Sequence, residues 1–389
     1  MIESTKRVLF AISDTGVGHR SAANAIIDSL RDEKNVHCDI QDLLRATRFP
    51  GIADAPEIYD YCSKKHVWLN DMFFRRTNFV NRIKSLTSLV YLSSGRQIES
   101  VLSQLCPDAV VAVHPLVIGL LEKARRATGA TWPIITVVTD LVTIHASWAT
   151  PGADLYVAPT PDAKQALLRY RVPEDRIVVG GFPVHLKFLV GVPSQADARV
   201  RLGIDPNPYT VLFTGGGVGA GNMDAWIRAL EQHCGDKQIL VVTGRNKALY
   251  DELHACQHRS GQFHVFGFVD NMEELMAAAD VIITKAGPGT IMEGAALRRP
   301  QIITGAIGIQ ELGNIDFARN NRLGYFCPDP IEACQLINTL AAQSKQETIP
   351  YHKVEQMLNG SKGIGQIIMK QLDAGRVAEP QQWNRNRGA

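Results

Sequence analysis

Glycines placed between a short apolar run and a helical stretch are the features of this sequence that most directly suggest chemistry. The clearest case is DVIITKAGPGTIMEGA (280–295), where an apolar run ends at Thr284 and Gly287 and Gly289 precede a helical stretch. Glycines let the backbone approach a ligand closely, and the free N–H groups of a helix start attract an anion. A diphosphate is therefore the expected ligand of this turn.

Polar side chains follow the same turn at positions suited to binding hydroxyl groups. Glu293 could bind ribose hydroxyls, or it could form a capping box with Thr290. Gln310, Glu311 and Asn314 follow the next apolar run in GAIGIQELGNIDFA; they could bind the hydroxyls of a sugar or be exposed polar residues of an ordinary helix start. The spacing fits neither GxxxxGK[ST] nor GxGxxG, which argues against an ATPase and a dinucleotide enzyme.

The elements that must position these residues alternate between strand and helix. Short, continuously apolar runs are typical of parallel strands buried on both faces, and helical stretches lie between them. This alternation predicts a doubly wound α/β protein whose ligands bind beyond the carboxyl ends of the strands. The expected strands are 6–13, 108–115, 133–140 and 154–159 in the first half, and 210–217, 238–245, 263–269, 280–287 and 300–305 in the second.

The length of 389 residues exceeds one ordinary hydrophobic core, so two domains are expected. The strand–helix pattern restarts near Tyr209, after a proline-containing stretch. We therefore expect one domain at 1–190 and a second at 208–360. Residues 361–389 are expected to form a helix and tail that pack back on the first domain.

Composition excludes several classes of protein. The net charge is only +2, so no overall field favours nucleic acid. Seven cysteines without a CxxC pair argue for a reducing compartment and against a disulfide framework or a zinc site. The first ten residues lead straight into a strand, and no window approaches eighteen uninterrupted apolar residues. We therefore expect neither a targeting peptide nor a transmembrane helix.

Several segments together resemble one family. ITKAGPGTIMEGA followed by IQELGN is similar to the donor site of family 28 glycosyltransferases, and most closely resembles the monogalactosyldiacylglycerol synthases and bacterial diacylglycerol glycosyltransferases. SDTGVGHRSAANAI resembles the N-terminal SDTGGGH motif, and VTDLVTIHASW, GFPV and VVTGRNKAL match further segments in order. The resemblance covers about residues 6–330. Val17 departs from a glycine of the family pattern, and Ile309 and Leu312 depart from a glycine and a lysine.

The resemblance implies a GT-B fold, in which two Rossmann-like domains face a central cleft. The acceptor and the membrane-docking surface would belong to the N-terminal domain, and a UDP-sugar would bind the C-terminal one. Phe268 could equally be a core residue. The residues implied for the diphosphate are Gly287, Gly289 and Thr290, with Gly215, Gly216 and Gly217 as the loop over it. Glu293 would bind the ribose, and Arg245, Phe268 and Val269 would surround the uracil. Gln310 and Glu311 would bind the sugar, with Asn314 beside them.

The same resemblance gives a role to His19, which lies where the N-terminal glycine turn meets a helix. An inverting transferase must remove a proton from the acceptor hydroxyl, and an ordinary histidine, with a pKa near 6.5, suits that transfer. We expect His19 to be the base or to position the hydroxyl, with Asp14 or Asp140 orienting it; a capping or packing role is the alternative. The other residues expected on the acceptor side are Gly18, His145 and Trp148. His114 is expected to line the cleft or to be structural.

A basic and aromatic segment, WLNDMFFRRTNFVNRIKSLTSLVYL (68–92), could contact a membrane. Phe73, Phe74, Arg75 and Arg76 are its densest cluster, and basic residues beside an apolar face suit an interfacial helix on anionic lipid. The alternative is an amphipathic helix that packs on the core and exposes its basic side.

The resulting prediction is an inverting, metal-independent glycosyltransferase that moves a hexose from a UDP-sugar to diacylglycerol. Galactose is slightly favoured over glucose, and no cofactor or metal is expected. The expected location is cytoplasmic, peripheral to the inner face of a membrane. Two alternatives remain open: the same fold acting on a polyprenyl-linked or small-molecule acceptor, and a nucleotide-sugar-binding regulator without turnover.

Overall fold

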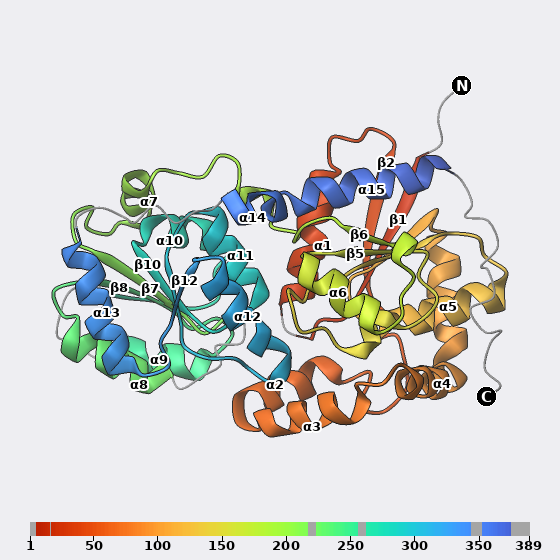
Figure 1. Cartoon of the computed structure of the whole chain (residues 1–389), viewed down its shortest axis with the longest axis horizontal. Helices are drawn as coiled ribbons and strands as arrows, with labels where there is room; N and C mark the ends of the chain where they lie inside the picture. Colours follow the sequence, from red (N-terminus) through yellow and green to blue (C-terminus); the bar gives the residue numbers. More distant parts are fainter. Residues whose placement is uncertain (1–4, 16, 217–222, 256–261, 344–351, 375–389) are drawn as a thin grey trace. The chain divides into compact units, whose positions relative to one another are not determined.

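The computed structural model describes residues 5–15, 17–216, 223–255, 262–343 and 352–374. The chain divides into two compact units, each with its own parallel sheet (Figure 1). Unit 1 comprises Met1–Tyr59, Met72–Pro183 and Asn359–Ala389, and unit 2 comprises Asp60–Asp71 and Val184–Leu358.

The sheet of unit 1 has six strands in the order β2-β1-β3-β4-β5-β6, and every neighbouring pair is parallel. Because all strands run the same way, their carboxyl ends share one edge of the sheet. The strands are β1 (Lys6–Ile12), β2 (Val36–Asp42), β3 (Ala109–Ala112), β4 (Ile134–Val137), β5 (Leu155–Ala158) and β6 (Ile177–Val179).

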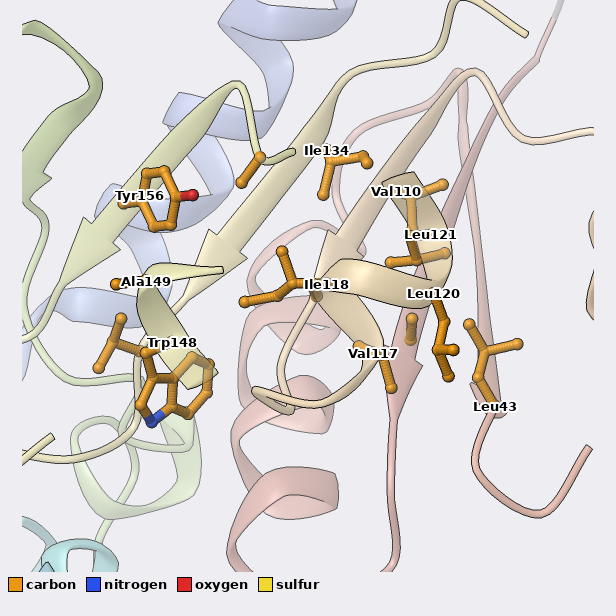
Figure 2. Packing of buried hydrophobic residues seen from close by; sticks show 14 of the residues in the cluster. Leu43, Val110, Val117, Ile118, Leu120, Leu121, Ile134, Trp148, Ala149 and Tyr156 are labelled. Carbon is orange, nitrogen blue, oxygen red and sulfur yellow. The ribbon is translucent and has the colours of Figure 1, made fainter. Parts of the chain in front are cut away.

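Alternating side chains of these strands supply two separate cores, one on each face of the sheet. Leu9 and Val110 belong to a cluster shared with helix α5, and Phe10 and Val111 belong to a second cluster shared with α1 and α15. Figure 2 shows the first cluster, in which α5 residues such as Ile118 gather over the strands. The helices associated with this sheet are α1 (Gly18–Ser29), α4 (Val80–Leu105), α5 (Val117–Thr128), α6 (Pro161–Arg169) and α15 (Gly360–Ala374), with short 3-10 turns η1 (Ala146–Ala149) and η2 (Glu174–Arg176). Helices α2 (Ala55–Lys65) and α3 (Val67–Thr77) are each divided between the two units, because Asp60–Asp71 belongs to unit 2.

The last described helix, α15, lies beside α1 on one face of this sheet (Figure 1). Ser29 Oγ donates to the Ser361 carbonyl at 2.9 Å, and Ile364 and Ile368 are fully buried. Residues 359–374 thus fold with unit 1, although 175 residues of unit 2 precede them.

Replacing Gly360 by alanine should loosen this attachment. A Cβ atom at Gly360 would lie 2.2 Å from the Phe182 carbonyl oxygen, and backbone cannot move aside as a side chain can. We expect a loss of about 1–3 kcal/mol in the free energy of unfolding of unit 1, measured by thermal unfolding and by protease protection of α15. Gly235→Ala is the control, because its nearest atom would be at an ordinary 3.4 Å. Equal melting temperatures for the two variants would contradict the prediction.

The sheet of unit 2 also has six parallel strands, in the order β12-β11-β10-β7-β8-β9. Val211 and Phe213 face a core formed with α8, α9 and α13, and the buried Leu212 between them points to the opposite face. The strands are β7 (Thr210–Thr214), β8 (Gln238–Val242), β9 (Phe263–Phe266), β10 (Val281–Thr284), β11 (Gln301–Ile303) and β12 (Gly324–Phe326). The helices are α7 (Gln195–Leu202), α8 (Met223–His233), α9 (Lys247–Ala255), α10 (Met272–Ala278), α11 (Pro288–Ala296), α12 (Ile309–Asn320), α13 (Pro330–Ala342) and α14 (His352–Leu358), with the 3-10 turn η3 (Leu186–Phe188).

Residues 191–207, which lie between the two expected domains, fold with unit 2, as do residues 184–190, which were expected in the first domain. Arg199 of α7 is buried and forms an ion pair of 2.7 Å with Asp280, and its Nε donates to the Ala278 carbonyl at 3.0 Å. A buried guanidinium needs such partners, and here they fix α7 to the segment before β10.

The doubly wound α/β class is confirmed, and all nine expected strand segments contain a strand. The sequence prediction omitted β2, β6 and β12, which are edge strands of their sheets. Edge strands need less apolar surface; β2, for example, reads VHCDIQD. The single helix expected over 68–92 is instead two helices, α3 and α4, because Phe79 has an extended backbone.

Candidate functional site

The candidate donor-binding residues of unit 2 follow the carboxyl ends of neighbouring strands. Along the sheet order, Gln310 and Glu311 follow β11, Gly287 follows β10, and Gly215 follows β7. Arg245 and Phe268 come next, after β8 and β9. The residues expected to bind a sugar, a diphosphate and a uracil therefore line one sheet edge in that order. Gly217 lies outside the described residues.

The turn after β10 leads into α11 with Gly287 as the N-cap residue. Thr290 lies within the helix, so the capping box considered for Thr290 and Glu293 is wrong. A Cβ atom at Gly289 would meet nothing within 4 Å. Packing within the protein therefore does not require glycine at this position, and close approach of a ligand to the helix start would explain it.

Lys285, which was not among the expected site residues, is the first residue of this turn. A Cβ atom at Gly216 would lie 3.1 Å from Lys285 Cε, and one at Gly287 would lie 2.9 Å from Lys285 Nζ. The ammonium group pairs with the buried carboxylate of Glu311, whose second oxygen accepts the Ile307 N–H at 2.8 Å. A cation thus stands between the two glycine loops expected to hold a diphosphate.

The residues at the start of α12 differ in their accessibility. Glu311 and Asn314 are buried, and Asn314 Nδ2 donates to the Ala286 carbonyl at 2.9 Å. These two side chains therefore tie α12 to the Lys285–Gly287 turn. Gln310 is half-buried and is the member of the set with an accessible side chain.

Glu293 lies on α11, where its surroundings raise the pKa of its carboxyl group. Burial raises the pKa of its carboxyl to about 7, the cation of Lys187 opposes this shift, and the carboxylate of Glu273 adds to it. Lys187 Nζ forms an ion pair of 2.6 Å with Glu273. A carboxylic acid that changes charge near neutral pH is a common feature of binding and catalytic sites.

The candidate uracil-binding residues lie after β8 and β9. Phe268 is 58% exposed, which excludes the core role considered for it. The Arg245 guanidinium carbon lies 5.6 Å from the centre of the Phe268 ring, within cation–π range. An exposed aromatic face beside a guanidinium can stack on a planar base, and Val269 follows directly in the chain.

In unit 1, His19 lies in the first turn of α1, at the carboxyl end of β1. Its ring is edge-on to His114, with centroids 4.7 Å apart, and its centroid is 6.2 Å from that of Trp148. Thr139 Oγ1 is 3.4 Å from its Nδ1, and the Val113 carbonyl accepts a hydrogen bond from the ring. These partners follow β3 and β4, so three neighbouring strands position the imidazole.

This environment keeps His19 neutral. Burial lowers the pKa of His19 to about 4, although the hydrogen bond to Val113 and the charge of Asp14 act in the opposite direction. The pKa of His114 is also well below its ordinary value because of burial and the neighbouring His19. One nitrogen of neutral His19 carries a proton and the other keeps its lone pair, as a hydrogen-bond acceptor or a base requires.

The two aspartates expected to orient His19 have other partners. Asp14 forms a two-point ion pair with Arg20, at 2.7 and 2.8 Å, and its own N–H donates to Asp42. Asp140 accepts a hydrogen bond of 2.6 Å from Trp148 Nε1. Asp14 therefore links the end of β1 to the first turn of α1, and Asp140 holds the Trp148 ring that lies beside His19.

The turn between α3 and α4 is joined to the loop that carries Trp148. His145 Nε2 is 3.1 Å from Thr77 Oγ1, and Asn78 Oδ1 accepts the Ala146 N–H at 2.7 Å and the Tyr170 hydroxyl at 2.8 Å. Trp148 is 1% exposed, so in this conformation it supports the His19 site from within the core. Gly18 is exposed at the start of α1.

Asn78→Ala should loosen the loop around η1. The substitution removes the acceptor of the buried Ala146 N–H, at a cost of about 1–3 kcal/mol. We expect amide exchange at 144–149 to accelerate at least tenfold, measured by hydrogen–deuterium exchange and mass spectrometry. Asn81→Ala, at an exposed position of α4, is the matched control. Unchanged exchange at 144–149 would show that Asn78 does not hold this loop.

In the part of the chain that the structure describes, no three His, Cys, Asp or Glu side chains are grouped as a metal site requires. No described helix is both long and apolar enough to cross a bilayer.

Comparison with known families shows which family this chain belongs to. The family model "Monogalactosyldiacylglycerol (MGDG) synthase" matches residues 19–184, and the model of the family 28 glycosyltransferase C-terminal domain matches residues 210–304. Monogalactosyldiacylglycerol synthase 2, chloroplastic, of Arabidopsis thaliana is 32% identical over 351 residues, which cover 86% of this chain and 74% of the relative. The chain belongs to the MGDG synthase family. The resemblance inferred from the motifs is confirmed.

A probable MGDG synthase of Nicotiana tabacum, also chloroplastic, is 32% identical over 348 residues. The match covers 86% of this chain and 64% of that relative. The chain thus spans slightly less than two thirds of the length of the first curated relatives that it matches.

Solved structures resemble the fold at much lower identity. MurG of Acinetobacter baumannii has a TM-score of 0.54 and 16% identity, over 94% of this chain and 99% of that chain. Anabaena HepE, in complex with UDP-glucose, has a TM-score of 0.56 and 14% identity, over 95% of this chain and 99% of that chain. The expected GT-B fold is confirmed. At these identities the likeness shows the fold alone.

The departures from the MGDG synthase motifs fall at helix starts. Val17 is the N-cap residue of α1, and Ile309 is the first residue of α12. Leu312, in place of the family's lysine, is 54% exposed. These positions border the two candidate sites without entering the Lys285–Glu311 pair.

Proposed function

We propose that this chain is a glycosyltransferase that moves a hexose, with galactose slightly favoured over glucose, from a UDP-sugar to diacylglycerol. The proposal extends to an inverting, metal-independent reaction at the cytoplasmic face of a membrane. Its main support is the order of groups along the carboxyl edge of unit 2 in a member of the MGDG synthase family: hydroxyl binders, glycine turns with a lysine, then a guanidinium and an exposed aromatic ring.

The proposed donor site follows from this order. The N–H groups at the start of α11 and the ammonium of Lys285 would stabilise the diphosphate and the charge that develops on leaving UDP. Glu293 would accept the ribose hydroxyls as a carboxylate, and Phe268 would stack on the uracil. Gln310 would bind the sugar, while Glu311 and Asn314 hold the start of α12 in place.

In the proposed reaction, the acceptor oxygen attacks the anomeric carbon as the bond to UDP breaks. The acceptor hydroxyl loses its proton to neutral His19, directly or through a positioned water. Thr139 and the Val113 carbonyl fix the imidazole, and Trp148 forms one side of its surroundings.

A transfer assay tests this proposal. Purified protein is incubated with diacylglycerol in anionic-lipid micelles and with radiolabelled UDP-galactose or UDP-glucose, each with and without a chelator. We expect one labelled glycolipid, formed from one donor and undiminished by the chelator. Inversion is checked by the anomeric configuration of the product. Saturable UDP binding without any product would leave the donor site but reject diacylglycerol transfer, and would favour another acceptor or a binding role.

We further propose that α3 docks on the membrane. In α3 no residue is fully buried; Trp68 is 62% exposed and Phe73 is 51% exposed, and Arg75 and Arg76 are exposed in its last turn. By contrast, α4 buries Ile83 and packs on the core, as the alternative interpretation expected for the whole segment. Aromatic and cationic residues exposed on one short helix suit an interfacial element on anionic lipid.

Reversing two charges should therefore weaken membrane binding. Each Lys or Arg near an anionic surface contributes about 1 kcal/mol, so Arg75→Glu/Arg76→Glu should reduce partitioning onto anionic liposomes more than tenfold. The control is Arg169→Glu/Arg228→Glu, which reverses two exposed charges on α6 and α8. Liposome flotation gives the bound fraction, and undiminished binding of the α3 variant would reject this role.

A further inference from the structure

A cavity of about 500 Å³ lies within unit 1. Its walls come from the first turns of α4, from α5 between Gly119 and Arg126, from the segment 150–154 with Tyr156 of β5, and from the segment 172–176 before β6. The segments 150–154 and 172–176 directly precede β5 and β6, so this part of the wall lies at the amino edge of the sheet. His19 follows β1 and lies at the opposite, carboxyl edge.

The wall between α5 and β5 is held rigidly. The Arg125 guanidinium pairs with Asp154 at 2.5 Å and donates to the Gly152 carbonyl at 2.8 Å, and Asp154 also accepts the Ile134 N–H at 2.8 Å. Gly152 has a φ of +131°, and a Cβ atom there would lie 2.3 Å from Glu122 Cγ. The cavity is therefore formed by the fold itself and does not depend on the rotamer of one exposed side chain.

The charge of this cavity is unbalanced. Its two acidic residues are already paired, Asp154 with Arg125 and Glu122 with Arg126. Three further cations line it: Lys84, Lys123 and Arg176. All three are half-buried, where water screens a charge less than it would at the surface. The charge of Arg176 also acts on the Tyr156 hydroxyl in the cavity wall. Burial raises the pKa of this hydroxyl, and the positive charge of Arg176 lowers it.

We propose that this cavity is a binding site for a phosphate monoester, distinct from the UDP-sugar site. A phosphate monoester carries close to two negative charges at neutral pH and offers three acceptor oxygens, which matches a cavity lined by several cations from α4, α5 and the segment before β6. A carboxylate would neutralise only one of them. The volume falls within the range of small-molecule sites and leaves room beyond the phosphate, beside Val172 and Pro173.

The phosphate could belong to a soluble metabolite or to a lipid headgroup. The second source is relevant because Leu89 and Leu92, on the same helix as Lys84, are 56% and 84% exposed. Both sources share the same recognition chemistry, and the two arms of the experiment distinguish them.

Binding is tested on the full chain, with excess UDP present so that the donor site of unit 2 does not take up the probe. The soluble arm uses equilibrium dialysis with labelled orthophosphate and with glycerol 3-phosphate. The lipid arm uses flotation with phosphatidylcholine vesicles, with and without phosphatidic acid. The test variant is Lys123→Gln/Arg176→Gln. The control, Arg96→Gln/Lys370→Gln, removes two exposed cations that do not line the cavity.

We expect the test variant to bind the phosphate probe at least tenfold more weakly than the wild type, and the control to bind as the wild type does. Weakening in the soluble arm identifies a soluble phosphate ester. Weakening confined to phosphatidic acid vesicles identifies a headgroup. Equal binding by wild type and test variant in both arms, or an equal loss in the control, overturns the proposal. UDP binding by the test variant, measured separately, should be unchanged because unit 2 is intact.

Discussion

Replacing His19 by alanine is expected to lower kcat for glycosyl transfer by about 10²–10⁴-fold, the usual contribution of a positioned general base. UDP affinity should stay unchanged, because the donor-binding residues belong to unit 2. His19→Gln should be as inactive as His19→Ala, since an amide can occupy the space and hydrogen-bond but cannot take up a proton near neutral pH.

The pH dependence of kcat in the wild type should be that of a buried imidazole. Because the pKa of His19 is lowered to about 4, the ring is already unprotonated at pH 5 and above. We expect kcat at saturating donor to be level from about pH 5 upward and to fall only as pH drops through about 4. An exposed histidine would instead lose activity below about pH 6.5.

His37→Ala is the matched control for both measurements, because its side chain is 58% exposed on the edge strand β2. Retention of normal turnover by His19→Ala, with its circular dichroism spectrum unchanged, would remove the proposed role. A loss of activity together with a lower melting temperature would instead point to packing against His114 and Trp148.

The strands could be predicted where the sequence of a single strand is a continuous apolar run. Runs such as VLFA and VII are apolar throughout, because both faces of a central parallel strand are buried. β6 and β12 are only three residues each and lie at sheet edges, so their sequences contain too little apolar pattern to be recognised. The break between α3 and α4 was missed because Asn78 and Phe79 are neither glycine nor proline.

The candidate sites were predictable to the level of the turns and not to the level of side-chain partners. The glycines after β10 and the histidine after β1 stand out locally. Lys285 had an available signal, since it is the first residue after a buried strand and directly precedes the glycine turn. Its pairing with Glu311 joins residues 26 positions apart, and Lys187 approaches Glu273 across 86 positions. Such pairs depend on tertiary structure, which strand periodicity does not encode.

Glu293→Gln is expected to give the second large effect, in opposite directions on binding and on stability. At pH 8 the wild-type carboxyl is mostly ionised and would accept ribose hydroxyls in charge-assisted hydrogen bonds. Exchange for an amide should weaken UDP binding by about 10–100-fold, because hydrogen bonds to a charged group contribute about 1.5–3 kcal/mol. Isothermal titration with UDP measures this change, with Glu252→Gln on the exposed side of α9 as the control.

The wild-type affinity should also depend on pH in a defined direction. With a pKa of about 7, the ionised fraction of Glu293 falls about tenfold between pH 8 and pH 6, so UDP should bind correspondingly more weakly at pH 6. UDP itself titrates in this range, but its effect on the pH dependence of the affinity is the same for the wild type and for Glu293→Gln. The ratio of wild-type to Glu293→Gln affinity isolates the residue, and a ratio that does not change with pH would contradict the assignment.

Stability should change in the opposite direction, which separates binding from packing. A folded-state pKa raised from 4.5 to about 7 means that the folded protein holds the proton more tightly than the unfolded chain. The free energy of unfolding therefore falls as pH rises from about 4.5 to about 7, by at most about 3 kcal/mol, and stays reduced above that range.

Glu293→Gln removes this loss of stability. Without ligand, the variant should therefore melt above the wild type at pH 8 and close to it at pH 4. A variant that melts higher yet binds UDP more weakly would show that the folded protein holds this carboxylate at a cost in stability, as expected of a ligand-binding group. A variant that melts lower at pH 8 would assign Glu293 to the framework of α11 instead.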